Sequence, residues 1–155
     1  MSAAAAVRVR LDEVPSLVGA VLPPSRWIDV TQERIDAFAA AVDDRQWIHV
    51  DPKRAARGPF GATIAHGVLT LGLVFRLWYE VVGVDGAALT VNYGADRVRF
   101  PAPVPAGSRV RAIFRIEEAT PHELGVRAGV NVTVEVEGEG KPACVADLVV
   151  LFVRE

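Results

Sequence analysis

The spacing of apolar residues changes about halfway along this chain of 155 residues. Between residues 31 and 82 the apolar residues recur every three or four positions, which is the period of a helix with one buried face. From residue 88 onward they alternate with polar residues, which is the period of a strand with one wet face. The pattern therefore predicts helices in the first half of the chain and strands in the second.

Two helices are expected early in the chain, and each begins at a residue that can cap it. Thr31 can cap the first helix through its hydroxyl oxygen. The apolar face of this helix carries Ile35, Phe38, Ala39 and Val42. Asp51 followed by Pro52 is the pattern of a cap with proline at the first helical position, and Gly58 and Pro59 should end this short helix.

The longest apolar run of the chain, residues 67–82, predicts a central helix. It is apolar nearly all round, which indicates a helix covered by protein on most of its sides. The run contains Arg76 and Glu80 and is shorter than the roughly 20 clean apolar residues of a membrane span. We therefore expect no transmembrane segment and no membrane partner.

At least four long strands are expected in the second half. The segments are ALTVNYGADRVRF (88–100), RVRAIFRI (109–116), VNVTVEVE (130–137) and ACVADLVVLFVRE (143–155). Each has one apolar face, and the turn signal EGEGKP joins the last two, so they predict an antiparallel sheet. A sheet with one apolar face and a helix that is apolar all round should pack with the sheet wrapped around the helix, in the α+β class.

Composition narrows the class of protein. Hydrophobic residues make up 51% and charged residues 23%, as in a globular domain, and the net charge of -2 gives no general attraction for nucleic acid. The single cysteine, Cys144, excludes an internal disulfide and favours a reducing compartment. Arg8 and Arg10 interrupt the alanine-rich start before a signal-peptide core develops, so we expect a cytoplasmic protein. The sequon at Asn131 is then better explained as part of a strand.

Candidate chemistry gathers in the stretch DDRQWIHVDP, residues 43–52. It places Asp44 and His49 five residues apart, a spacing that alone is more often structural. A second histidine, His66, precedes Gly67 at the start of the apolar helix, where free N–H groups and the helix dipole favour negative charge on an oxygen. An acid, an imidazole and an oxyanion donor are the parts of a proton-transfer site.

Three stretches together carry a family resemblance: DDRQWIHVDP, GPFGATIAHGVLTLGLV and VNYGADRVRFPAPVPAGSRVRA. They resemble the MaoC-type dehydratases, which are (R)-specific enoyl-CoA hydratases of the hot-dog fold, from about residue 31 to the C-terminus. The resemblance implies a single hot-dog domain over 1–155, with 1–25 as an N-terminal segment. It also implies an acyl-CoA thioester substrate in fatty acid metabolism, no cofactor beyond the coenzyme A of that substrate, and a homodimer.

The family motif, a pattern like G-D-x-N-P-x-H followed by H-G, assigns the catalytic residues. Its acid, base and oxyanion-donor positions fall on Asp44, His49 and Gly67. This chain departs from the pattern with Asp43 for glycine and with Gln46 and Trp47 for asparagine and proline. The sequence QWIHVD is similar to a nodulation-protein-N-like subgroup of the same family.

The resemblance also implies a mechanism, in which water adds to C3 of a trans-2-enoyl thioester. The water would lie between Asp44 and His49, and the N–H of Gly67 would bind the thioester oxygen. An imidazole has an unperturbed pKa of about 6.5, near working pH, which favours His49 as the base. Substrate contacts are expected from Gln46, Trp47, His66 and Asn92. For His66 a hydrogen bond to the loop is the favoured role, and for Asn92 a structural role is equally plausible.

Several alternatives stay open at this stage. On chemistry alone Asp43 rivals Asp44 as the acid, and only the motif spacing decides between them. A metal site from His49, Asp51 and His66 is conceivable, although the chain lacks the i, i+4 ligand spacing of a zinc helix, so we expect no metal. A hot-dog thioesterase, or an acyl-thioester-binding partner subunit without catalysis, would be a different class of protein.

Arginines on the expected strands offer two interpretations. Coenzyme A carries phosphates, so cations are expected near the mouth of its pocket. Candidates on the strands are Arg97, Arg99, Arg109 and Arg111. Cross-strand pairing with Glu135 and Glu137 explains such positions equally well, so the residues that contact the phosphates are left unassigned.

Overall fold

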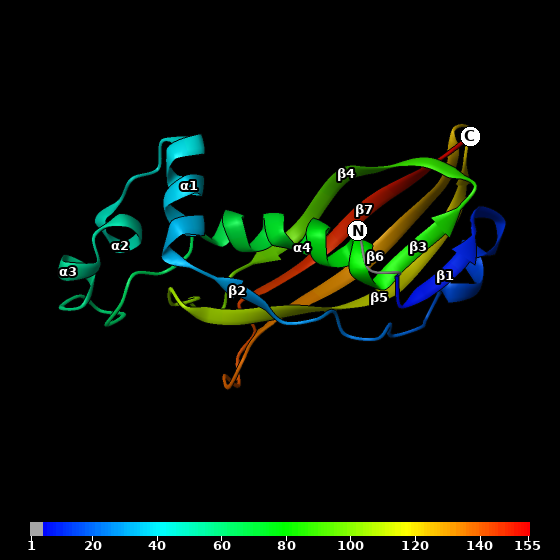
Figure 1. The fold of residues 1–155 in the computed structure, drawn as a ribbon. Helices are drawn as coiled ribbons and strands as arrows, with labels where there is room; N and C mark the ends of the chain where they lie inside the picture. The colour runs from blue at the N-terminus through cyan, green and yellow to red at the C-terminus, as the bar shows by residue number, and fades with distance from the viewer. Residues whose placement is uncertain (1–4) are drawn as a thin grey trace.

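A curved antiparallel sheet around one helix forms most of the computed structural model, which describes residues 5–155 (Figure 1). The sheet has five strands in the order β2-β5-β6-β7-β4. In chain order they are β2 (Ile28–Val30), β4 (Ala87–Arg99), β5 (Ser108–His122), β6 (Gly125–Val136) and β7 (Cys144–Arg154). Helix α4 (Gly67–Val81) lies against the sheet. The α+β class, the four long strands and the central helix are confirmed.

Alternation along the strands builds the core. In β6 every second residue from Val126 to Val136 is buried, and the residues between them are only half-buried. The register places these residues opposite the buried positions of β5, so that Phe114 faces Val132 and Ala112 faces Val134. Because the side-chain period of a strand is two, this register turns the buried side chains of both strands to the same face of the sheet, toward α4.

Helix α4 supplies the other half of the core, and the single chain leaves one stripe of it exposed. Leu77 and Trp78 are buried, and the Trp78 ring meets Phe114 edge-on at 5.1 Å between centroids. On the opposite side Val68 and Tyr79 are 60% and 50% exposed. The chain therefore covers α4 on most sides, as expected, and leaves open one stripe that includes Val68 and Tyr79.

The N-terminal segment is part of the fold. Strand β1 (Val7–Arg10) pairs in parallel with β3 (Val82–Asp85), which directly follows α4. The 3-10 helix η1 (Leu11–Leu17) then places Leu11 and Val14 in the core. The apolar spacing did not predict these elements, because four-residue strands are too short to show a period.

Three helices form an arm at one end of the sheet (Figure 1): α1 (Gln32–Val42), α2 (Trp47–Val50) and α3 (Pro52–Ala55). Both predicted caps are confirmed. The hydroxyl of Thr31 accepts from the N–H of Arg34 at 3.2 Å, and the Asp51 carboxylate accepts from the N–H of Arg54 at 3.0 Å. Helix α3 ends at Ala55, before the expected stop, and the one-turn helix α2 was not predicted.

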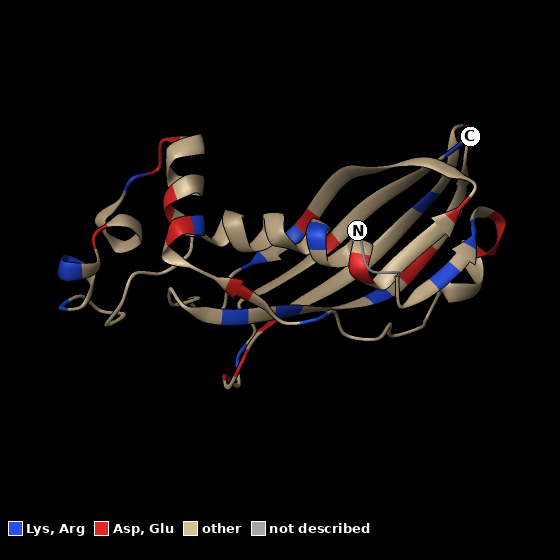
Figure 2. Cartoon of the chain, in the orientation of Figure 1, with Lys and Arg blue, Asp and Glu red and all other residues tan. Residues whose placement is uncertain are grey.

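Most arginines of the sheet are paired with acids, and Figure 2 shows basic and acidic residues on its strands. Arg111 binds Glu135 at 2.7 Å, and Arg109 forms a bidentate pair with Glu137, so the cross-strand interpretation of these arginines is confirmed. Asn131 lies within β6, as expected. Among the described residues, no helix has the length and apolar character needed to cross a membrane.

Cys144 lies at the start of β7 and is fully buried in the core. Burial raises the pKa of its thiol to about 11, because the surrounding apolar side chains disfavour the thiolate. At neutral pH the group is therefore a protonated core side chain, and it is not available as a nucleophile.

Candidate active site

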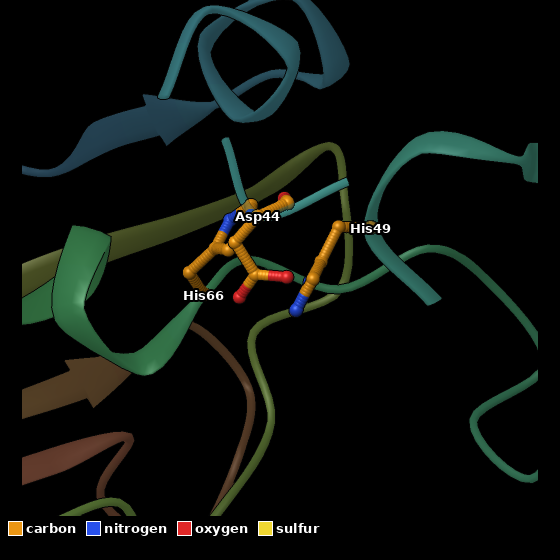
Figure 3. A group of neighbouring side chains, drawn as sticks. All are labelled: Asp44, His49 and His66. Atoms are coloured by element: carbon orange, nitrogen blue, oxygen red, sulfur yellow. The ribbon is translucent and has the colours of Figure 1, made fainter. Parts of the chain in front are cut away.

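The candidate site lies where the arm meets the first turn of α4. Asp44 belongs to the loop after α1, His49 to α2, and His66 directly precedes α4. One ligand atom from each of these three side chains lies within 4.8 Å of the other two. Figure 3 shows the Asp44 carboxylate pointing toward the ring of His49. The fold therefore brings together two residues of the predicted acid–base pair and a second histidine.

The hydrogen bonds of His49 decide which of its nitrogens is available. Its ring is buried, and Nδ1 lies 2.7 Å from the carbonyl oxygen of Ile64. A carbonyl oxygen only accepts, so Nδ1 carries the hydrogen and donates it. In the neutral ring this leaves a lone pair on Nε2, on the side of Asp44 (Figure 3). His49 thus presents a base to the site.

The backbone of His49 is held by residues that the sequence did not single out. The side-chain amide of Gln32, the first residue of α1, donates to the carbonyl oxygen of His49 at 2.7 Å. The amide oxygen of Gln32 accepts in turn from the hydroxyl of Thr63. These contacts join segments that are far apart in the chain, so no local sequence pattern predicts them. They fix α2, and hence the His49 ring, against α1.

His66 connects the parts of the site. Its Nε2 donates to the backbone carbonyl of Asp44 at 2.9 Å, and its ring stacks on that of His49 with centroids 3.7 Å apart. Its Nδ1 is buried and has no hydrogen-bond partner within residues 5–155. The favoured hydrogen bond between His66 and the loop is therefore present. The same ring also holds His49 in place.

The two neighbouring acids, rivals on chemistry alone, differ clearly in placement. Asp43 is the exposed C-cap of α1, with a left-handed backbone at φ 59° that turns the chain. Asp44, after the turn, is half-buried in the histidine cluster, and its carboxylate lies 3.5 Å from the N–H of Gln46. The geometry thus brings Asp44 to the histidines, while Asp43 faces solvent.

Gly67 begins α4 and borders a cavity of about 360 Å³. His49 lines the same cavity, whose walls include the apolar side chains of Phe60, Phe100 and Val104. A Cβ atom on Gly67 would come within 2.6 Å of the Phe100 ring, so only glycine leaves this wall where it is. The first N–H groups of a helix have no partner within it, which suits an anionic oxygen at this position.

The other predicted substrate contacts lie outside this cavity. Gln46 is exposed at the N-terminus of α2. Trp47 is half-buried and lines a separate hollow on the arm. Asn92 is exposed on β4, opposite Val150 of β7. Their roles stay predictions, and the single chain places none of the three beside His49.

The donor set of the cluster fits a metal ion in chemistry but not in direction. A metal binds an imidazole nitrogen in the plane of its ring, along the lone pair. The rings of His49 and His66 are stacked and only 21° from parallel, so their in-plane lone pairs do not converge on one point. Asp51, the acid considered as a third ligand, instead caps α3. Binding a metal here would require the two stacked rings to separate.

Comparison with known proteins identifies the class. A family model described as a MaoC like domain matches residues 13–139, and the chain belongs to this family. The match begins upstream of residue 31, from which the resemblance was traced, and it includes residues 13–17 of η1. The predicted family and its dehydratase class are confirmed.

Relatives within the family are similar over most of the chain. The chain is 51% identical over 144 residues to 3-hydroxyacyl-thioester dehydratase Z of Mycobacterium tuberculosis, covering 91% of this chain and 94% of that protein. It is 44% identical over 145 residues to Nodulation protein N of Rhizobium leguminosarum, covering 92% and 90%. The subgroup inferred from QWIHVD is therefore confirmed.

Solved structures support the hot-dog arrangement. An unliganded R-hydratase from Pseudomonas aeruginosa is 25% identical, with a TM-score of 0.69 over 87% of this chain and 83% of that one. A chain of the HadBC complex, a 3R-hydroxyacyl-ACP dehydratase from Mycobacterium tuberculosis, is 18% identical. Its TM-score is 0.66 over 87% of this chain and 97% of that one, which shows the shared fold alone.

The wall beside Gly67 gives a stability prediction. Replacing Gly67 with alanine should lower the free energy of unfolding by about 1–3 kcal/mol, because the new methyl group overlaps Phe100. Gly72 is the matched control, since it lies in the same helix and its Cβ would have open space. Alanine there should raise stability by about 0.5–1 kcal/mol. Urea unfolding of both variants measures the difference, and equal effects would contradict the steric explanation.

Proposed function

We propose that this protein is an (R)-specific enoyl-CoA hydratase, which is the hydration direction of a 3-hydroxyacyl-thioester dehydratase. The observation that carries the proposal is the meeting of three groups beside one apolar cavity. They are the Asp44 carboxylate, the free nitrogen of His49 and the N-terminus of α4 at Gly67. The dehydratase name of the relative that is 51% identical supports the reaction class.

The water to be added would sit between Asp44 and His49. Its oxygen attacks C3 while Nε2 of His49 takes one of its protons. The electron pair of the C2–C3 double bond moves toward C2, and negative charge develops on the thioester oxygen. The dyad then returns a proton to C2 on the same face, so that one water is added across the double bond.

Each group has a role that its environment supports. His49 is the base because the hydrogen bond from Nδ1 to Ile64 leaves its lone pair on Nε2. Asp44 orients the water and balances the charge that forms on the ring. The N–H of Gly67 binds the thioester oxygen, where the start of α4 favours negative charge. The apolar cavity wall excludes bulk water from this charge.

His66 acts as a positioning residue in this scheme. Its hydrogen bond fixes the backbone of Asp44, and its ring supports one face of His49. No metal ion is required, because the dyad supplies both proton transfers and the thioester oxygen has a backbone donor. The reaction needs no cofactor other than the coenzyme A of its substrate. We place the protein in the cytoplasm because its single cysteine, which can form no internal disulfide, favours a reducing compartment.

The assembly we propose is a homodimer joined along β4. This strand forms one edge of the sheet, and an unpaired edge invites pairing with another chain. Its exposed apolar residues are Leu89, Val91 and Tyr93. The open stripe of α4 adds Val68 and Tyr79, so that one chain leaves two apolar surfaces uncovered. A two-fold pairing would cover them and would place Asn92 at the interface.

Substitution of the dyad tests the mechanism. Asp44→Asn and His49→Ala should each lower the rate of crotonyl-CoA hydration by at least about 100-fold, in line with the loss of an acid–base group. Asp43→Asn is the matched control, because it removes an adjacent carboxylate that faces solvent. The loss of absorbance of the enoyl thioester reports the rate. Equal losses at the two acids would overturn the choice of Asp44, and full activity of His49→Ala would remove the hydratase proposal.

The product tests stereochemistry and metal use together. We expect the (R)-3-hydroxyacyl thioester, and we expect EDTA to leave the rate unchanged because the stacked rings hold no common metal position. A coupled assay with an (S)-specific dehydrogenase should give no signal. A positive signal would refute the stereochemistry, and inactivation by EDTA that zinc reverses would refute the metal-free mechanism.

Size-exclusion chromatography with light scattering tests the assembly. Two copies of the 16.6 kDa chain should elute together, since pairing removes the open β4 edge of each. Tyr93→Lys on β4 should weaken the dimer and lower activity with it. A fully active monomer would refute the homodimer, and activity only after addition of a second, different chain would favour a mixed assembly.

A further inference from the structure

Cations on the arm differ from those on the sheet. Most arginines on the strands of the sheet are paired with acids, as Arg97 is with Asp147 at 2.6 Å. Among residues 5–155, no acidic side chain forms an ion pair with Lys53, Arg54 or Arg57. Figure 2 shows this positive charge gathered on α3 and in the loop after it. The arm thus carries charge that the chain itself does not neutralise.

These cations border one hollow of about 480 Å³. Its lining residues are Trp47, Asp51, Lys53, Arg54, Arg57 and Gly58. Three cations against one carboxylate leave two positive charges in excess. The Asp51 carboxylate is already occupied, because it accepts the N–H of Arg54 as the cap of α3. The hollow is therefore a local anion-attracting surface on a chain whose net charge is -2.

Part of the hollow is held in place before any ligand arrives. The guanidinium of Arg54 lies over the Trp47 ring, 4.5 Å from its centroid. Behind the ring, a Cβ atom on Gly58 would come within 2.8 Å of it, so the loop backbone packs directly against the indole. A stacked guanidinium keeps its N–H groups free at its edge, where they can donate to phosphate oxygens.

We propose that this hollow binds the phosphate groups of the coenzyme A part of the thioester substrate. The inference rests on the proposed function and adds to it a binding subsite on the arm. Arginine and lysine side chains together supply the charge and the hydrogen-bond donors that phosphate groups take. Three of the four strand arginines first considered for this role are already paired with acids: Arg97, Arg109 and Arg111. The fourth, Arg99, donates to the backbone carbonyl of Val98. The three arm cations, in contrast, border one common hollow.

The position of the hollow suits a substrate that also reaches the dyad. Trp47 and His49 belong to the same turn of α2, and five residues separate His49 from Arg54. Five residues span at most about 18 Å even when fully extended. The pantetheine arm of coenzyme A separates its phosphates from the thioester by an extended chain of comparable reach. One substrate can therefore contact both places.

An acidic carrier protein is the alternative source of negative charge. A carrier protein would bind the arm through a broad surface, whereas the observed cations line a hollow beside a fixed indole ring. The hollow favours small phosphate groups over a protein surface. The experiment below treats the carrier protein as a separate outcome.

Two substrates that differ in the phosphorylated adenosine part of coenzyme A test the proposal. Crotonyl-CoA and crotonyl-pantetheine share the acyl group and the arm, but only the first carries the nucleotide phosphates. The ratio of kcat/KM for crotonyl-CoA to that for crotonyl-pantetheine should fall about tenfold or more in the double variant Arg54→Gln, Arg57→Gln, because charge-assisted hydrogen bonds are lost. Any general damage to the fold lowers both rates and cancels in the ratio.

Arg154→Gln is the matched control. Arg154 is also an exposed arginine with no acidic partner among the described residues, but it lies at the end of β7, away from the arm (Figure 1). The substitution removes one positive charge far from the arm and should leave the ratio unchanged. A ratio that stays constant in the double variant, or that falls equally in the control, would overturn the proposal. Loss of activity toward an enoyl carrier protein with an unchanged ratio would also overturn it, in favour of protein docking.

Calorimetry separates this proposal from the proposed function. Free coenzyme A should bind the intact protein, and the double variant should bind it at least about tenfold more weakly, with an affinity that falls as salt is added. This binding requires no turnover. An inactive protein that still binds coenzyme A through Arg54 and Arg57 would refute the hydratase and keep the subsite. If the protein is an active hydratase but the double variant binds coenzyme A with unchanged affinity, the subsite is refuted and the hydratase proposal is kept.

Discussion

The packing of α4 against the sheet is the interaction on which the rest of the structure depends. Leu77 and Trp78 are buried between the helix and the strands, and each such side chain contributes roughly 1.5–3 kcal/mol through the area it removes from water. That burial fixes where α4 begins. The start of α4 in turn places His66 and Gly67, and His66 holds the loop of Asp44 through one hydrogen bond. The site is thus anchored on the core, although most of its side chains come from the arm.

The contact between His49 and His66 helps to fix the orientation of the proposed base, His49. A base on a one-turn helix would be poorly fixed by that helix alone, because so short an element has little stability of its own. His49 is instead held on three sides, by the carbonyl of Ile64, by the amide of Gln32 and by the ring of His66. Each contact leaves Nε2 free. The three neighbours thus fix the orientation of His49, and none of them occupies the nitrogen that would take the proton.

The sequence predicted the parts of the fold whose signal is local and missed those whose signal is not. Alternation such as that around Phe114 repeats over enough residues to reveal a strand, and the caps at Thr31 and Asp51 bond to backbone three residues away. Strand β1 is too short to show a period and forms only because β3 lies beside it. For α4, the apolar residues on all sides predicted a helix, but they did not show what packs on each of its faces. Composition does not tell whether a sheet or a second chain packs on a given face.

The same division applies to the candidate site. The motif spacing selected Asp44, His49 and Gly67, and the fold brings all three to one place. It gave no sign of Gln32, because an amide at the start of a helix has no pattern that points to a contact made across the fold. Nor did it show which nitrogen of His49 is free, since that depends on a backbone carbonyl. Residue type and spacing report chemistry, whereas direction comes from tertiary contacts.

The single chain leaves two different kinds of surface without a partner: apolar surface at β4 and α4, and positive charge on the arm. The edge of β4 and the open stripe of α4 expose apolar side chains and unpaired backbone groups, which only another polypeptide can cover on both counts. The hollow beside Trp47 exposes three cations against one carboxylate, an excess of positive charge that an anion would neutralise. The net charge of -2 is a sum over the whole chain, so it does not reveal the local excess of positive charge on the arm. The local excess becomes visible only when each arginine is matched to its acid. Most cations of the sheet are paired with acids, whereas Lys53, Arg54 and Arg57 on the arm beside the dyad have no acidic partner among the described residues and remain available to a ligand.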